Sequence, residues 1–282
     1  MSTQKIIYQD AYSDVDIAAM NYMKEITFGF EYDGSASEIT RKWMNDVYVK
    51  LHAVNNDGTT TTPNASDYAE LKSIVEELDS LIETINITLL TGGASDECVS
   101  ETHAAYTSGT CWKTGTPKPN INIYITTRAR WETISNLDAT GLGGQFVTTW
   151  SSANMILYRS KGWIQDSLTA DQRKSLIREE LTQTLGLGKD SASYPTSIFY
   201  EDNEAEEYGW QTSYSELDKK IIKMVYDPRN KCGMTKDQAA EALKRPSAFI
   251  AGRSYEFSGI KANESDNAKT KLATRFASSN QR

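Results

Sequence analysis

The sequence predicts an α+β domain with a mixed twisted sheet and two long helices. Short alternating or β-branched segments predict the strands, and two stretches with apolar residues three and four apart predict the helices. These strands are separated along the chain by helices and long loops, which favours a mixed sheet. With 282 residues and 39% hydrophobic content, the chain is long enough to bury a sizeable core.

The first third of the chain predicts three strands and one long helix. Ile26–Tyr32 is β-branched and aromatic, Val47–Leu51 alternates, and Ile87–Leu90 is a short apolar run. Asn55–Pro63 is polar and predicts a loop. The helix is expected over Asp67–Asn86 because seven apolar residues share one face, namely Leu71, Ile74, Val75, Leu78, Leu81, Ile82 and Ile85.

The middle of the chain predicts three more strands and the second long helix. After a loop-like segment at Ala94–Pro119, Ile121–Thr126 alternates, and Val147–Trp150 with Met155–Tyr158 forms a pair of short strands. Thr169 is a suitable N-cap for the helix that follows. Apolar residues four apart give that helix one stripe, made of Ile177, Leu181 and Leu185.

Two shorter helices are expected near the end, over Leu217–Val225 and from Thr235 through Leu243. From about Gly252 onward the chain is polar with few apolar anchors. The sequence therefore predicts a polar N-terminal arm (residues 1–20), one domain (residues 21–251) and a polar C-terminal tail (residues 252–282).

Charge and composition exclude several partners. The net charge is −8 and the pI is about 5.0, whereas nucleic acid and anionic membranes are bound by positive patches. No run of about 18 apolar residues is present, so no membrane span is expected. The first thirty residues lack a basic start followed by an apolar core, and no signal peptide is predicted.

The three cysteines leave two interpretations open. Cys98 and Cys111 flank a polar loop, and a disulfide between them would stabilise the fold by roughly 3 kcal/mol in the chain-entropy model. The alternative is three reduced thiols, with Cys232 as the third. No Cys/His cluster indicates a structural zinc.

The segment from Arg178 to Asp190 has the frame of a zinc-peptidase helix without its histidines. A metzincin helix reads H-E-x-x-H-x-x-G-x-x-H, with the glutamate as general base. Aligned on Gly186, Glu179 and Gln183 replace the first two histidines, and Glu180 keeps the base position. Lys189 stands at the third histidine, with Asp190 beside it as a substitute ligand.

These replacements predict different chemistry. Glutamate ligates through oxygen, and glutamine is a weak oxygen donor better suited to calcium or a hydrogen bond than to zinc. The only histidines, His52 and His103, lie far away in sequence, and each is expected to be a surface or satisfied polar residue. A purely structural interpretation is also open, in which Gly186 ends the helix and Glu179 and Gln183 form a solvated pair.

Several segments together resemble a largely bacterial family of zincin-like proteins of unknown function, whose helix reads E-E-x-x-Q-x-x-G-L-x-x-D. The matching segments are Thr27–Tyr32, Arg41–Trp43, Asn120–Ile125, Arg178–Ser191, Ser197–Phe199, Ser215–Asp218, Tyr226–Arg229 and Gly233–Thr235. The resemblance spans roughly residues 20 to 245 and implies a zincin-like, metzincin-type fold. It implies no activity, because the family's own helix lacks the zinc ligands.

Three functions follow from this resemblance and the residues. The first is a pseudo-metallopeptidase that binds a protein partner through an aromatic, acidic loop carrying Tyr200, Tyr208 and Trp210. The second is a structural or assembly protein of a virion or surface appendage, which places it outside the cell or on a virion. The alternative is a hydrolase with Glu180 as base and a metal on Glu179, Gln183 and Asp190. No cofactor is expected, with a divalent zinc or calcium ion left open.

Overall fold

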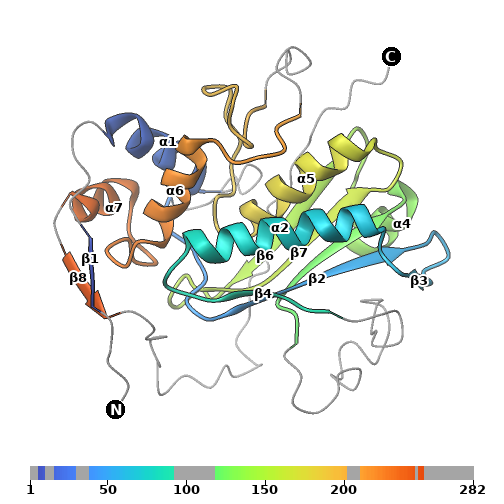
Figure 1. The fold of residues 1–282 in the computed structure, drawn as a ribbon, viewed down its shortest axis with the longest axis horizontal. Helices are drawn as coiled ribbons and strands as arrows, with labels where there is room; N and C mark the ends of the chain where they lie inside the picture. The colour runs from blue at the N-terminus through green and yellow to red at the C-terminus, as the bar shows by residue number, and fades with distance from the viewer. Residues whose placement is uncertain are drawn as a thin grey trace.

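The computed structural model describes residues 6–9, 16–29, 38–91, 118–201, 210–244 and 247–250. A mixed sheet lies at the centre of the molecule, with the long helices α2 and α5 side by side against it (Figure 1). Helices α1, α6 and α7 gather at one end of this layer. The predicted α+β class with a mixed twisted sheet and two long helices is confirmed.

The sheet has three parallel central strands and an antiparallel strand at each end of its path. Its path runs β3 (Thr60–Thr61), β2 (Val47–Val54), β5 (Ile121–Thr126), β7 (Leu157–Gln165) and β6 (Gly144–Trp150), and β4 (Ile87–Leu89) also pairs with β2. Strands β2, β5 and β7 are parallel, while β6 is antiparallel to β7. In this register Val54, Thr126 and Gln165 end at the same edge of the sheet.

One face of the sheet supports α2 (Ala65–Leu81) and α5 (Ala170–Gln183). Alternate residues of the strands point to this face, as shown by the buried Val49, Ile121 and Ile123 of the main core. The other face carries Tyr124 and Trp163, which pack with Trp131 of α4 (Arg128–Ser135) in a second cluster. The helices of the two faces thus bury strands that are apolar on both sides.

The remaining helices are α1 (Ile17–Thr27), α6 (Glu216–Tyr226) and α7 (Lys236–Leu243). Helices α1 and α6 are in contact, and both contribute buried residues to the main core. A separate two-stranded sheet joins β1 (Ile6–Gln9) to β8 (Ser247–Ile250) in antiparallel register. Among the described residues, no helix is both long and apolar enough to cross a membrane.

One predicted strand is wrong. Ile26 and Thr27 end helix α1 instead of starting a strand, and the rest of Ile26–Tyr32 beyond Gly29 lies outside the described residues. Met23 and Ile26 are buried three residues apart on one helical face, so tertiary packing overrides the β-branched pattern. Helix α1 also crosses residue 20, where the boundary between arm and domain is predicted.

The other predicted elements are present with shifted bounds, whereas α4, β1 and β8 were not predicted and β3 lies in the predicted loop Asn55–Pro63. Helix α2 ends at Leu81, five residues before the predicted end, and β7 is much longer than its predicted segment. Thr169 caps α5 as predicted, and Thr235 caps α7. In both caps a glutamine three residues later completes a reciprocal capping box.

Candidate functional site

The motif residues occupy the second half of α5, which is buried on every side. The helix begins at an exposed cap, but every residue from Ser175 to Gln183 is buried. An amphipathic surface helix keeps one polar face in water. Here the polar residues of the motif must therefore find partners inside the protein.

Glu180, at the general-base position, lies between α5 and the sheet. The residue is 0% exposed. A Cβ atom on Gly144 of β6 would lie 2.4 Å from Glu180 Oε1, and one on Gly162 of β7 would lie 3.8 Å from Glu180 Cβ. The two glycines therefore leave the space that the glutamate side chain fills.

Glu179 and Gln183 lie one helical turn apart and both are buried, with exposures of 3% and 0%. Gln183 Nε2 donates a hydrogen bond of 2.8 Å to Oδ1 of Asp190. The structure thus brings together two of the predicted ligands, Gln183 and Asp190, by a direct hydrogen bond. Glu179 shares their helix face.

The opposite face of α5 is tied to α2 and to the segment before α6. Arg178 donates to Glu77 Oε2 at 2.8 Å and to Glu70 Oε1 at 3.1 Å, and its guanidinium lies 4.5 Å from the ring centroid of Tyr214. The Tyr214 hydroxyl is 2.7 Å from Thr182 Oγ1. These contacts fix the rotation of α5 about its axis.

The end of α5 is closed by backbone geometry and by two ring donors. Gly186 has a φ of 103°, and a Cβ atom there would lie 2.1 Å from the carbonyl oxygen of Arg41. Trp43 Nε1 donates to the Thr184 carbonyl and Tyr226 Oη donates to the Leu185 carbonyl, both at 2.9 Å. Helix α5 ends at Gln183 with Thr184 as its C-cap, so the predicted cap at Gly186 is two residues too late, and Gly186 supplies the left-handed turn that follows.

The residues at the three ligand positions do not fit a zinc ion. Zinc sites in proteins are built from imidazole, thiolate and carboxylate groups, and this set supplies a carboxylate, an amide and a second carboxylate. The Gln183 amide uses its N–H group toward Asp190, and its Oε1 is buried without a hydrogen bond, so this position supplies at most one weak oxygen ligand. Within the described part of the chain, no three His, Cys, Asp or Glu side chains gather closely enough to hold a metal.

His52 lies away from the motif, on the face of the sheet opposite α5. Its ring stacks on Tyr124 at 4.8 Å, and Nε2 lies 2.8 Å from Asn122 Oδ1. Burial lowers the pKa of His52 to about 4, so the ring is neutral at neutral pH. The prediction that this histidine is a surface or satisfied polar residue is only partly met, because His52 is buried and its Nδ1 has no hydrogen-bond partner. His103 lies outside the described residues.

The predicted binding and disulfide residues are described only in part. Trp210 is one of the most exposed large apolar residues in the described part of the chain, at 43%, and Tyr200 is half-buried beside a short bridge to Ser191. Tyr208, Cys98 and Cys111 lie outside the described residues. Cys232 is a half-buried free thiol.

Sequence reasoning missed a buried polar chain next to the motif. Tyr22 Oη donates to Ser197 Oγ at 2.6 Å, and Ser197 Oγ donates to Asp218 Oδ1 at 2.5 Å. Burial raises the pKa of the Asp218 carboxyl, while hydrogen bonds from Ser197 and Ser215 lower it in part. Only the Ser215-x-x-Asp218 spacing of a capping box signals this chain in the sequence.

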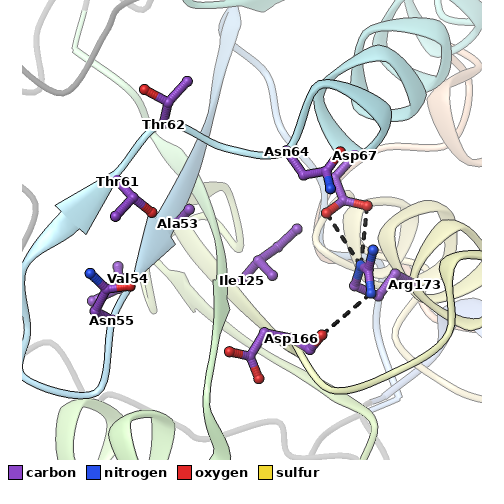
Figure 2. Close-up of a pocket in the computed structure, with 10 residues that line it drawn as sticks. All are labelled: Ala53, Val54, Asn55, Thr61, Thr62, Asn64, Asp67, Ile125, Asp166 and Arg173. Atoms are coloured by element: carbon purple, nitrogen blue, oxygen red, sulfur yellow. Dashed lines mark hydrogen bonds and ion pairs between the residues drawn. The ribbon is translucent and has the colours of Figure 1, made fainter.

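A pocket of about 420 Å³ lies at the other end of α5 (Figure 2). It is bounded by the carboxyl ends of β2, β5 and β7, by the first turn of α2 and by Arg173 of α5. Its lining consists of Ala53, Val54, Asn55, Thr61, Thr62, Asn64, Asp67, Ile125, Asp166 and Arg173. Open sheets of this kind commonly bind ligands beyond the carboxyl ends of their parallel strands.

Most of the chain matches one known protein family. Residues 17–245 match the profile of a family described as "Protein of unknown function (DUF2927)". The expected resemblance over residues 20 to 245 is confirmed as membership of a family of unknown function. No curated protein sequence matches the chain.

Among solved structures, the chain is similar to two of myroilysin and one of archaemetzincin. One myroilysin structure is 13% identical with a TM-score of 0.33, over 78% of this chain and 99% of that one. The other is 12% identical with a TM-score of 0.32, over 66% of this chain and 82% of that one. Archaemetzincin from Methanopyrus kandleri is 10% identical with a TM-score of 0.31, over 64% of this chain and 95% of that one.

Proposed function

The chain belongs to the DUF2927 family, and we propose that it is a zincin-like protein that has lost catalysis and works by binding or assembly. The observation that carries this proposal is the closed ligand face of α5. At the positions where a metzincin helix presents histidines to a metal, Gln183 is hydrogen-bonded to Asp190 and Glu179 is buried beside it. In this proposal the helix keeps the spacing of the motif, while its polar side chains have a structural role.

The position of Glu180 supports the same conclusion. A general base must come within hydrogen-bond reach of the proton that it abstracts, directly or through one water molecule. Glu180 is enclosed by α5 and the glycines of β6 and β7. A substrate would have to separate the helix from the sheet to reach it.

A hydrolase remains the alternative function, and Glu180 would then be its essential base. The test is hydrolysis of a denatured protein substrate and of a mixed peptide library, with and without added zinc or calcium. We expect no cleavage above a buffer control, for the unaltered chain and for Glu180→Gln alike. Cleavage that is lost specifically in Glu180→Gln would establish the alternative.

The binding role is proposed to use the segment around Trp210. A large aromatic side chain that is 43% exposed contributes apolar area to an interface at low conformational cost. The setting that we propose is an assembly outside the cell or on a virion, where the partner is a neighbouring protein or a second copy of the chain.

Sedimentation over a range of chain concentrations tests this binding role directly. We expect self-association or association with particle components, weakened about tenfold by Trp210→Ser. Tyr158→Ser is the matched control, because Tyr158 is 44% exposed and lies on β7, away from the segment around Trp210. Equal effects of the two substitutions, or a strictly monomeric chain that binds no particle component, would contradict the binding role.

A further inference from the structure

The pocket at the N-terminal end of α5 has a wall built from a buried ion pair. Arg173 Nε lies 3.2 Å from both carboxylate oxygens of Asp67, and Asp67 is almost fully buried in the first turn of α2. Arg173 Nη1 also donates to the carbonyl of Asp166 at 3.3 Å and to that of Leu168. The guanidinium and the Asp67 carboxylate therefore neutralise each other within the wall.

Asp166 adds a carboxylate that this pair does not neutralise. Its backbone is held by the bond from its N–H to the Thr126 carbonyl at 3.0 Å. Its side chain is exposed, and within the described residues it makes no hydrogen bond or ion pair. Figure 2 shows the carboxylate of Asp166 lying between Arg173 and Asn55, on the far side of its backbone from the guanidinium.

The rest of the lining is polar and uncharged around a small apolar floor. Asn55, Asn64, Thr61 and Thr62 supply amide and hydroxyl groups, and Ala53, Val54 and Ile125 supply aliphatic surface. Asn64 uses its Oδ1 to cap α2 and keeps its Nδ2 for other partners. The volume of about 420 Å³ falls in the range of small-molecule pockets, roughly 300–1,000 Å³.

We propose that this pocket binds a small ligand carrying one primary ammonium group on a polar body, with Asp166 as its counter-ion. The charged groups of the lining are two carboxylates and one guanidinium, which leaves one negative charge. An anionic ligand would face both carboxylates, whereas an ammonium group meets a carboxylate that has no other ion pair in the described residues. This site is independent of the proposed function, because it lies at the opposite end of α5 from the motif.

The ammonium group has two chemical sources that fit the volume, an amino sugar and the lysine side chain of a peptide. Four probes test the need for an ammonium group and distinguish the two sources: glucosamine, N-acetylglucosamine, glucose and Nα-acetyl-lysine amide. The measurement is an NMR titration of the full chain at low salt, following backbone amide shifts. We expect glucosamine or the lysine amide to shift the amides of Asn55, Thr61, Thr62 and Asp166, with millimolar or tighter affinity.

The charge requirement is tested with the same titration. The two neutral sugars should bind at least fivefold more weakly than the better amine, and Asp166→Asn should weaken that amine by about fivefold to tenfold. Asp171→Asn is the matched control, since it removes the same charge from the first turn of α5 but does not line the pocket. It should change the affinity by less than twofold.

Three results would overturn the proposal. They are the absence of pocket shifts with either amine, equal binding of glucose and glucosamine, and equal effects of Asp166→Asn and Asp171→Asn. The amine that binds more tightly identifies the source, and the site is supported whichever of the two amines that is. Because no probe contacts the motif, failure here leaves the proposed function of the domain intact, and failure of that function leaves this site intact.

Discussion

The two ends of helix α5 are built differently, although one continuous helix connects them. At its C-terminal end the polar residues of the motif are buried, and Gln183 donates a hydrogen bond to Asp190. At its N-terminal end a buried pair of Arg173 and Asp67 stands beside a pocket with an exposed carboxylate. The end that resembles an active site is closed, and the end without a motif is open.

This difference shows what a motif establishes and what it does not. The spacing of Glu179, Glu180 and Gln183 depends on helix geometry alone, which a helix keeps after its chemistry has changed. Access depends on what packs over the helix, here β6, β7 and the segment after Gly186. Burial of the motif residues therefore supports the proposed structural role, and the exposed Asp166 carboxylate in the pocket supports the proposed ligand site.

The largest expected effect is on the closed end, through Gly186→Ala. An alanine there would hold an unfavourable φ and place its Cβ against the Arg41 carbonyl. We expect a loss of about 3–5 kcal/mol in the free energy of unfolding, measured with urea. Gly141→Ala, at a φ of 81° with open space around it, should cost only about 1 kcal/mol. Equal costs would mean that the close approach at Gly186 is not needed.

At the open end, Arg173→Met should cost about 3 kcal/mol. The substitution keeps an apolar stem but leaves the buried Asp67 carboxylate without its guanidinium. Urea unfolding of Arg173→Met, of Asp67→Asn and of the double variant measures the coupling free energy. The double variant should recover part of the lost stability, and no recovery would show that the pair is not the basis of this wall.

A third buried polar group, His52, extends the comparison to the face of the sheet opposite α5. Burial lowers its pKa from the ordinary value of 6.5 to about 4 in the folded state, so between these values the unfolded chain binds more protons. Stability from this group is therefore lost as pH falls from 6.5 to 4, by about 3 kcal/mol in total. In His52→Gln, the decrease in unfolding free energy over this window should be smaller by about that amount. An unchanged decrease would contradict a buried neutral imidazole.

The proposed zincin-like origin of α5 can be tested by placing histidines at the two ligand positions of the helix. Glu179→His with Gln183→His places two imidazoles one turn apart, with Asp190 nearby. We expect zinc in about hundredfold excess over its Kd to stabilise this variant by about 2.7 kcal/mol, seen as a rise in Tm. The single variant Gln183→His should respond much less. A double variant that folds but does not bind zinc would contradict the proposed zincin-like origin of this helix.

The sequence predicts local features of the fold well because they depend on neighbouring residues. The cap at Thr169, the left-handed turn at Gly186 and the register of apolar residues in α2 and α5 are all local. The prediction at Ile26 is wrong because the burial of helix α1 comes from distant partners in α6.

The contacts that decide the role of the motif are equally distant in sequence. Arg178 pairs with residues about a hundred positions earlier, and Glu180 fills space left by Gly144 and Gly162. The pocket combines residues from three strands and two helices. No spacing in the sequence encodes such neighbours, although the glycines in β6 and β7 are a usable signal once the strands are known.

The most direct test of the central claim is the metal content of the purified chain, measured by elemental analysis before and after dialysis against a chelator. We expect far less than one transition metal per chain, with no change in Tm on chelation. About one tightly held metal per chain, lost in Glu179→Gln or Asp190→Asn but not in Asp171→Asn, would contradict it. That result would make the closed end of α5 a metal centre.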